Sequence, residues 1–203
     1  MPHPVTIEVD LKVKGTTESE DKDLSSLAVP FMCNDSFYSC LLNCAYTSKS
    51  STLEFALGSI ISSVEATLSL NIVDGSLPDG FHDCFAVITT GICNKSTTSD
   101  KNAERIDNEE IVLLDSRGGQ VLVTDDGKVK LSRRVVSVEF RGKLKVSVKA
   151  WRSDNNNIVK KEVFTPLESG FSHWTRRIGS CKMKLSVAWS LISDEPVYTN
   201  SVL

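Results

Sequence analysis

Strict alternation of apolar and polar residues is the feature that most constrains how this chain folds. The pattern runs through residues 5–13 (VTIEVDLKV), 64–72 (VEATLSLNI) and 183–191 (MKLSVAWSL). In a β-strand successive side chains point to opposite faces, so this period of two gathers the apolar side chains on one face. A helical period is almost absent. The sequence therefore predicts strands that each bury one face, beginning with 5–13.

Shorter apolar runs and frequent turn signals extend this pattern along the chain. Runs occur at 85–89, 111–114 and 121–123, and the stretches DGSLPDG, SRGG, DDG and SDNNN separate strands. This spacing is typical of an all-β sandwich or barrel. A length of 203 residues suits one domain with a real core. We therefore predict an all-β, antiparallel, Greek-key-like β-sandwich as a single domain over residues 1–203.

The stretch VVSVEFRGKLKVSVKAW predicts a β-hairpin. With the three-residue loop Arg141-Gly142-Lys143, Phe140 opposes Leu144 and the two apolar faces agree. A continuous strand with a bulge at Gly142 is the alternative.

Three stretches lack a strand pattern. Residues 15–29 are polar and acidic, and predict a surface connection with a short helical turn near Lys22–Leu27. Residues 30–52 show no clean period. Residues 94–110 are polar and predict a mobile loop.

Composition and termini exclude several classes of protein. No apolar run approaches the ~20 residues that span a bilayer, and MPHPVTIEVD is not a secretory signal. We therefore expect a cytoplasmic or nuclear protein with no membrane association. The six cysteines (33, 40, 44, 84, 93 and 181) are expected to be reduced thiols. Cys40 and Cys44 lack zinc-site spacing, so no metal site is predicted there.

Charge is divided unevenly along the chain. Residues 1–127 hold 8 Lys/Arg and 20 Asp/Glu, whereas residues 128–203 hold 15 and 6. Such asymmetry can mark a basic binding face. We favour the interpretation that acidic and basic strands lie side by side, because opposite charges attract in cross-strand pairs.

The candidate binding face is a basic stripe formed by Arg141, Lys143, Lys145 and Lys149. The three lysines share the polar side of one expected strand, and Arg133, Arg134 and Arg152 are close in sequence. The stripe could contact nucleic-acid phosphates. No aromatic residue alternates with the lysines to stack on bases, so a solvated outer face is the favoured interpretation.

The loop DGSLPDGFHD gathers Asp74, Asp79, His82 and Asp83 between two expected strands. Loop carboxylates can bind calcium through oxygen. EF-hand spacing is absent, and Asp-Gly pairs are turn formers, so a turn is favoured. Asp125 and Asp126 in TDDGK predict a turn for the same reason.

Catalytic candidates are few. The histidines are His3, His82 and His173, and His82 shares a strand face with Cys84 at i, i+2. No third partner completes a thiol nucleophile, and no nucleophile elbow, phosphate loop or zinc-protease motif occurs. We therefore predict no catalytic residues and no cofactor; an enzyme using His82 or His173 is the least favoured reading.

Several stretches resemble a known family. They are VTIEVDLKVKGTTESEDKDLS, STLEFALGSIISSVEATLSLNIVDGS, IVLLDSRGGQVLVTDDGKVKLSRRVVSVEFRGKLKVSVKAW and FTPLESG with IGSCKMKLSVAWSLIS. Together they resemble DUF6598, a domain family of unknown function in grasses. The resemblance covers most of the chain, and residues 30–52 depart from it.

The resemblance carries expectations of its own. Members of that family occur alone or fused to ribosome-inactivating N-glycosidase domains, and have no established activity. The resemblance implies a non-enzymatic interaction module with an unknown protein partner, related to defence or translation; a nucleic-acid or ribosome binder is the alternative. Members usually have strands ahead of the segment matching Val5–Lys14. The resemblance thus predicts an N-terminally truncated domain whose first strand is an edge prone to self-association.

Overall fold

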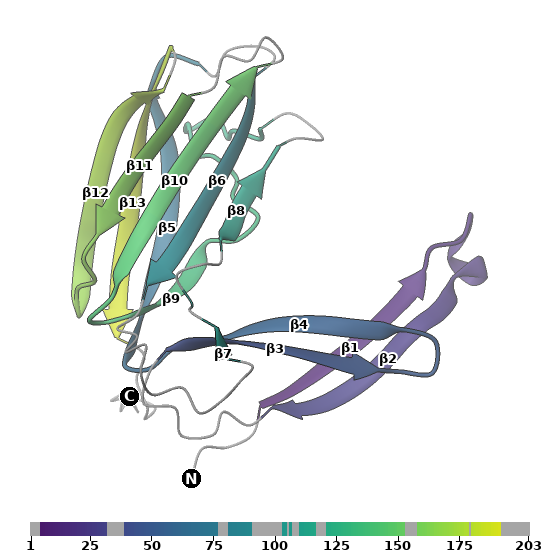
Figure 1. The fold of residues 1–203 in the computed structure, drawn as a ribbon. Coiled ribbons are helices and arrows are strands. Elements are labelled where there is room, and N and C mark those ends of the chain that lie inside the picture. Colours follow the sequence, from purple (N-terminus) through teal and green to yellow (C-terminus); the bar gives the residue numbers. More distant parts are fainter. Residues whose placement is uncertain are drawn as a thin grey trace, which may run out of the picture. The chain divides into compact units, whose positions relative to one another are not determined.

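A computed structural model describes most of the chain as antiparallel β-structure (Figure 1). The described residues are 5–31, 39–76, 81–90, 103–104, 106, 110–116, 121–152, 158–178 and 180–191. Two compact units are present: unit 1 is Met1–Ile61 with Cys93–Arg105, and unit 2 is Ser62–Ile92 with Ile106–Leu203. The all-β fold class is confirmed, and a single domain over residues 1–203 stays a prediction.

Unit 1 contains a two-stranded ladder and a small three-stranded sheet. Its elements are β1 (Val5–Val13), a 3-10 turn η1 (Glu18–Glu20), β2 (Lys22–Phe31), β3 (Cys40–Thr47), β4 (Thr52–Ser59) and β7 (Ala103–Glu104). The ladder is β1-β2 and the sheet has the order β4-β3-β7. The prediction of a mobile loop over 94–110 lies mostly outside the described residues; within it, β7 pairs with β3.

The strand predicted at residues 5–13 is present, but the prediction that it buries its apolar face is wrong. Val5 is 63% exposed and Val13 is 51% exposed, while Ile7 and Val9 are half-buried. β1 pairs with β2 alone among the described strands. A two-stranded ladder has no opposing layer of its own, so it cannot bury a whole face.

The surface connection predicted over 15–29 is also wrong, because most of it is strand β2. Ser25 and Val29 are buried and Leu27 is half-buried, so the inward side begins with a serine that hides the alternation. The helical turn lies earlier, at η1. Two carboxylates accept hydrogen bonds from backbone amides in the connection between β1 and β2. Glu20 Oε2 accepts from the Thr17 amide at 3.2 Å, and Asp21 Oδ1 accepts from the Gly15 amide at 2.8 Å.

Residues 30–52, which show no clean period in the sequence, contain strand β3. This strand forms a hairpin with β4. Thr47 pairs with Thr52 at the turn, where their hydroxyls lie 3.0 Å apart. The turn contacts β2, since Ser51 Oγ donates to the Leu24 carbonyl at 3.1 Å. Cysteine, asparagine and tyrosine on β3 obscure the apolar alternation that marks other strands.

Unit 2 is the β-sandwich. Its strands are β5 (Ser63–Asp74), β6 (Phe81–Thr90), β8 (Ile111–Asp115), β9 (Val135–Glu139), β10 (Lys143–Arg152), β11 (Ile158–Phe164), β12 (Ser169–Ile178) and β13 (Cys181–Leu191). One four-stranded sheet has the order β11-β10-β6-β8, and the other β12-β13-β5-β9. Figure 1 shows the two sheets layered face to face. The first strand of the unit, β5, pairs with the last, β13.

One hydrophobic core joins the inner faces of both sheets. Alternate residues of β5, β10 and β13 supply it, as the period of two predicts, and Leu68, Leu144 and Val187 are fully buried. Trp189 is 4% exposed, and its Nε1 donates to Ser172 Oγ at 2.9 Å. The prediction of an antiparallel β-sandwich is therefore confirmed, with its core within unit 2.

The hairpin predicted across Gly142 is wrong, and so is the bulged continuous strand. β9 pairs with β5, whereas β10 pairs with β6 and β11. The chain changes sheets in a turn, where the Gly142 amide donates to the Glu139 carbonyl at 2.8 Å. A Cβ at Gly142 would lie 1.7 Å from the Thr90 carbonyl oxygen, so glycine lets this turn pack against β6.

The segment between β8 and β9 follows the edge of β5. The Ile72 amide donates to the Gly127 carbonyl at 2.8 Å, and the Val129 amide donates to the Leu70 carbonyl at 2.8 Å. The apolar run predicted at 121–123 contributes one isolated bridge, Val123 to Val129, rather than a strand.

Candidate functional site

The predicted basic stripe lies on the outer face of β10. Lys143 and Lys145 are exposed and Lys149 is half-buried, while Leu144 and Val146 between them point into the core. The structure thus brings the three lysines to one face. Arg141 is exposed in the preceding turn.

Neighbouring strands add apolar residues to this face. In the antiparallel ladders, Lys145 lies opposite Val163 of β11 and Ile88 of β6, and Lys149 lies opposite Val159. Directly opposite residues share a face. Val159 and Val163 are 50% and 53% exposed. We call Lys143, Lys145, Lys149, Val159, Lys161 and Val163 the β10–β11 face; sequence reasoning missed its valines because β11 was not recognised as the partner strand.

The lysines of this face differ in their partners. Lys149 Nζ lies 2.8 Å and 2.9 Å from the two carboxylate oxygens of Glu110. Lys143 Nζ donates to Thr165 Oγ1 at 2.7 Å. In the described part of the chain, neither Lys145 nor Lys161 has an ion-pair partner. Among the lysines of this face, these two are the ones with no ion pair or side-chain hydrogen bond in the described structure.

The middle of the face holds small, buried residues. Ser147, between Lys145 and Lys149, is buried and its Oγ has no hydrogen-bond partner. It lies opposite Ala86, which is fully buried. The surface is the outer face of a sheet, and such a face suits contact with a macromolecule more than enclosure of a small substrate.

The other nearby arginines do not join the stripe. The Arg133 amide donates to the Leu113 carbonyl of β8 at 3.2 Å, two strands away from β10. The Arg134 carbonyl accepts from the Leu68 amide of the other sheet at 2.8 Å. The side chain of Arg152 lies outside the described residues. Closeness in sequence therefore did not predict closeness in space.

Beside the local pair of Asp126 with Lys128, two long-range ion pairs among the described residues join the acidic first part of the chain to the basic last part. They are Lys149 with Glu110, and Arg177 Nη2 with Asp74 Oδ2 at 3.3 Å. Neither pair joins two neighbouring strands, because β13 lies between β12 and β5 and Glu110 precedes β8, so the interpretation that acidic and basic strands lie side by side stays a prediction. β10 itself is flanked by β6 and β11, not by an acidic strand.

Of the candidate calcium ligands, the side chain of Asp74 is described; it is the last residue of β5, and its carboxylate contacts Arg177. His82 and Asp83 belong to strand β6 rather than to the loop between the strands. The side chains of Asp79, His82 and Asp83 lie outside the described residues. Over the residues that are described, no group of three or more His, Cys, Asp or Glu side chains is placed to hold a metal ion.

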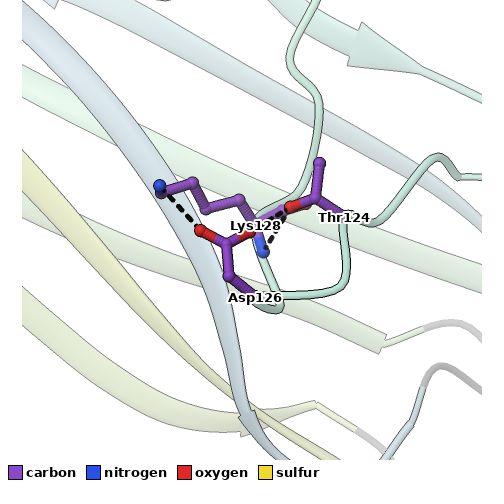
Figure 2. Close-up of polar contacts among 3 residues, drawn as sticks. All are labelled: Thr124, Asp126 and Lys128. Atoms are coloured by element: carbon purple, nitrogen blue, oxygen red, sulfur yellow. Dashed lines mark hydrogen bonds and ion pairs between the residues drawn. The ribbon is translucent and has the colours of Figure 1, made fainter.

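The Asp125–Asp126 turn is present and is locally stabilised (Figure 2). Asp126 Oδ2 lies 2.8 Å from Lys128 Nζ, and the Thr124 hydroxyl donates to Asp126 Oδ1. These contacts, chiefly the hydrogen bond from Lys128, lower the pKa of Asp126 to about 2. Gly127 has a φ of +79°, which suits the turn.

His173 lies on the exposed outer side of β12. Its ring stacks on Phe171 with centroids 6.1 Å apart, and Nδ1 lies 3.0 Å from Ser186 Oγ. A serine beside a histidine is part of a nucleophilic relay, but a third group must orient the base. In the described residues, His173 has no carboxylate partner. The side chains of His3, His82 and Cys84 lie outside the description.

The described cysteines do not form a metal-binding set. Cys40 and Cys181 are buried, and Cys44 is a half-buried free thiol on β3. Burial and the neighbouring Cys44 raise the pKa of Tyr46. Among the described segments, no helix has the length and apolarity needed to cross a bilayer.

The fold and this surface define a class: an all-β protein with a β-sandwich whose outer sheet face carries cations and half-exposed valines. A family model for a domain of unknown function (DUF6598) matches residues 1–187. The chain therefore belongs to the DUF6598 family. No curated protein and no solved structure matches it.

Proposed function

We propose that this chain is a non-enzymatic interaction module that binds a protein partner through the β10–β11 face. The observation that carries the proposal is the combination of two half-exposed valines, Val159 and Val163, with two lysines, Lys145 and Lys161, that have no ion-pair partner in the described structure. Burial of apolar side chains supplies affinity. Flanking charge selects the partner and speeds encounter. The expected partner surface is apolar at its centre and acidic around it.

Matched variants test this proposal in an extract from the source organism. Immobilised wild-type chain is compared with K145E/V163D, which reverses one cation and makes one valine polar. The control is K182E/K184E, which changes two lysines on the polar side of β13, in the other sheet. The proposal expects proteins that the wild type and the control retain and the face variant loses. Equal retention by all three chains would refute it.

The alternative is a nucleic-acid or ribosome-associated domain that uses Arg141, Lys143, Lys145 and Lys149. Three lysines on one face favour it, but Lys149 is paired with Glu110 and the neighbouring strand offers valines instead of aromatic rings. Stacking on aromatic rings is the usual source of affinity for single strands.

Titration with labelled RNA at low and high salt separates the two functions. Binding to phosphates would give a logarithmic salt slope of roughly −0.7 for each phosphate contacted on a single strand. A chain that binds no RNA at low salt is not such a module. Binding that K145E weakens and K182E does not would favour the alternative.

The family resemblance suggests the biological setting. We propose a role in defence or translation control in grasses, because resembling chains occur beside ribosome-inactivating N-glycosidase domains. The absence of catalysis and the location in the cytoplasm or nucleus stay predictions.

A further inference from the structure

The two sheets of unit 2 leave long strands at their edges. β11 pairs with β10 alone and β12 pairs with β13 alone among the described strands. They are 7 and 10 residues long, whereas the opposite edges, β8 and β9, are 5 residues each. In an antiparallel ladder, alternate residues of an edge strand direct their amide and carbonyl groups away from the sheet. Such an edge can accept another strand.

The sequence of β11, IVKKEVF, is complementary to itself when reversed about Lys161. An antiparallel copy places Lys160 opposite Glu162, Val159 opposite Val163 and Ile158 opposite Phe164. Opposite charges and apolar pairs are both favourable across strands. The like charges that meet are the two copies of Lys161, at the centre.

The fold places these residues on faces that allow this pairing. Lys160 and Glu162 lie opposite the core residues Val148 and Val146 of β10, so they are on the inner side of the sheet at its edge. In the described structure neither has an ion-pair partner. Val159 and Val163 are on the outer side and are about half-exposed. A second copy would pair both charges and cover part of both valines.

The other long edge strand, β12, has charges that disfavour pairing with a second copy. β12 carries Arg176 and Arg177, of one sign, and Gly170 with a φ of +105°. Inward-pointing or like charges on an edge strand discourage pairing. An inward Lys160 by itself would also discourage pairing. Because Glu162 lies two residues later on the same side, an antiparallel second copy places each Lys160 opposite a Glu162, and these charges attract.

We propose that two copies of this chain associate through β11, antiparallel and in register about Lys161, to join their sheets into one. This inference concerns the edge of the sheet and does not rest on the proposed function of its outer face.

Charge reversal tests the proposal by analytical ultracentrifugation of the full chain from micromolar to submillimolar concentration. The wild type should approach twice the 22.3-kDa mass of the chain as concentration rises. K160E and E162K each place like charges together twice, and each should weaken the dimer by at least about tenfold. The double variant K160E/E162K restores both pairs and should restore association. An equimolar mixture of the two single variants should form a heterodimer.

Two further variants keep the test specific. K161T removes the repulsion at the centre and should strengthen association, while R176E on β12 should leave it unchanged. Tryptophan fluorescence checks that each variant is folded. A wild type that stays monomeric at every concentration overturns the proposal. So does a dimer that both single reversals leave intact, since association would then use another surface.

Discussion

Trp189 shows how one side chain can be predicted from its strand and explained by its contacts. It occupies the inner side of β13 and donates through Nε1 to Ser172. We expect Trp189→Ala to lower the free energy of unfolding by about 3–5 kcal/mol, because it leaves a cavity in the core. Trp189→Phe should cost less, since it fills more of the space and loses mainly one hydrogen bond. Urea unfolding measures both, and a cost below about 1 kcal/mol for the alanine variant would contradict the burial.

Asp126 gives a prediction about pH. Its pKa in the folded chain is about 2, against an ordinary value of 3.8, because Lys128 and Thr124 hydrogen-bond to its carboxylate. The stabilisation is complete above the unfolded pKa and disappears as the pH falls from about 4 through 2. NMR titration of the side-chain carboxyl should show this midpoint.

The stability contribution has its own check. Asp126→Asn should remove the part of the acid destabilisation that arises from this turn, whereas Asp125→Asn in the same turn serves as the control. If acid unfolding profiles of the wild type and Asp126→Asn are parallel from pH 4 to pH 2, the turn does not supply this linkage.

At the scale of elements, the turn from β9 to β10 depends on the absence of a side chain at Gly142. A Cβ there would overlap the Thr90 carbonyl oxygen, which belongs to the backbone and cannot rotate away. We expect Gly142→Ala to cost at least about 1–3 kcal/mol, as overpacking does. Arg141→Ala, at an exposed position of the same turn, is the matched control and should be near neutral. Equal stability of both variants would mean that the turn is not packed in this way.

The strands of unit 1 and unit 2 should differ in protection. β1 has one neighbour among the described strands, and several of its apolar side chains are exposed, whereas β13 lies between β12 and β5. Native-state hydrogen exchange should therefore be faster for amides 5–13 than for amides 181–191. Comparable protection of both segments would show that β1 is held as firmly as a central strand.

For the whole molecule, unfolding should not be a single transition. All three tryptophans, at 151, 174 and 189, belong to unit 2, which holds the large core. In the described part of unit 1, the buried apolar side chains are Val29, Cys40 and Leu41. We expect tryptophan fluorescence to report a later transition than the far-UV circular dichroism, which also senses the strands of unit 1. Coincident curves would indicate one cooperative unit.

The amino-acid sequence by itself predicted strands where the alternation of apolar and polar residues is long and uninterrupted, as in β1, β5 and β13. The period of two predicted β1, β5 and β13, and the inward positions of Trp189 and Val187, because side-chain direction in a strand is a local property. It also placed Lys143, Lys145 and Lys149 on one face. Strands β2 and β3 escaped because serine, cysteine and asparagine interrupt the alternation, and β4, β11 and β12 were not predicted either.

Only the tertiary structure decided which strands are neighbours. Val138 could pair with Val146 or with Val64, and both pairings match one apolar face with another. The local pattern therefore cannot choose between the two registers. The choice depends on packing across the sandwich, where Gly142 lets the chain turn against β6 and cross to the other sheet. The same long-range pairing brought Val163 beside Lys145 and exposed Val5 in a two-stranded ladder. Strand pairing joins residues far apart in sequence. Its energy depends on how the side chains of the paired strands pack against their neighbours and against the opposite sheet.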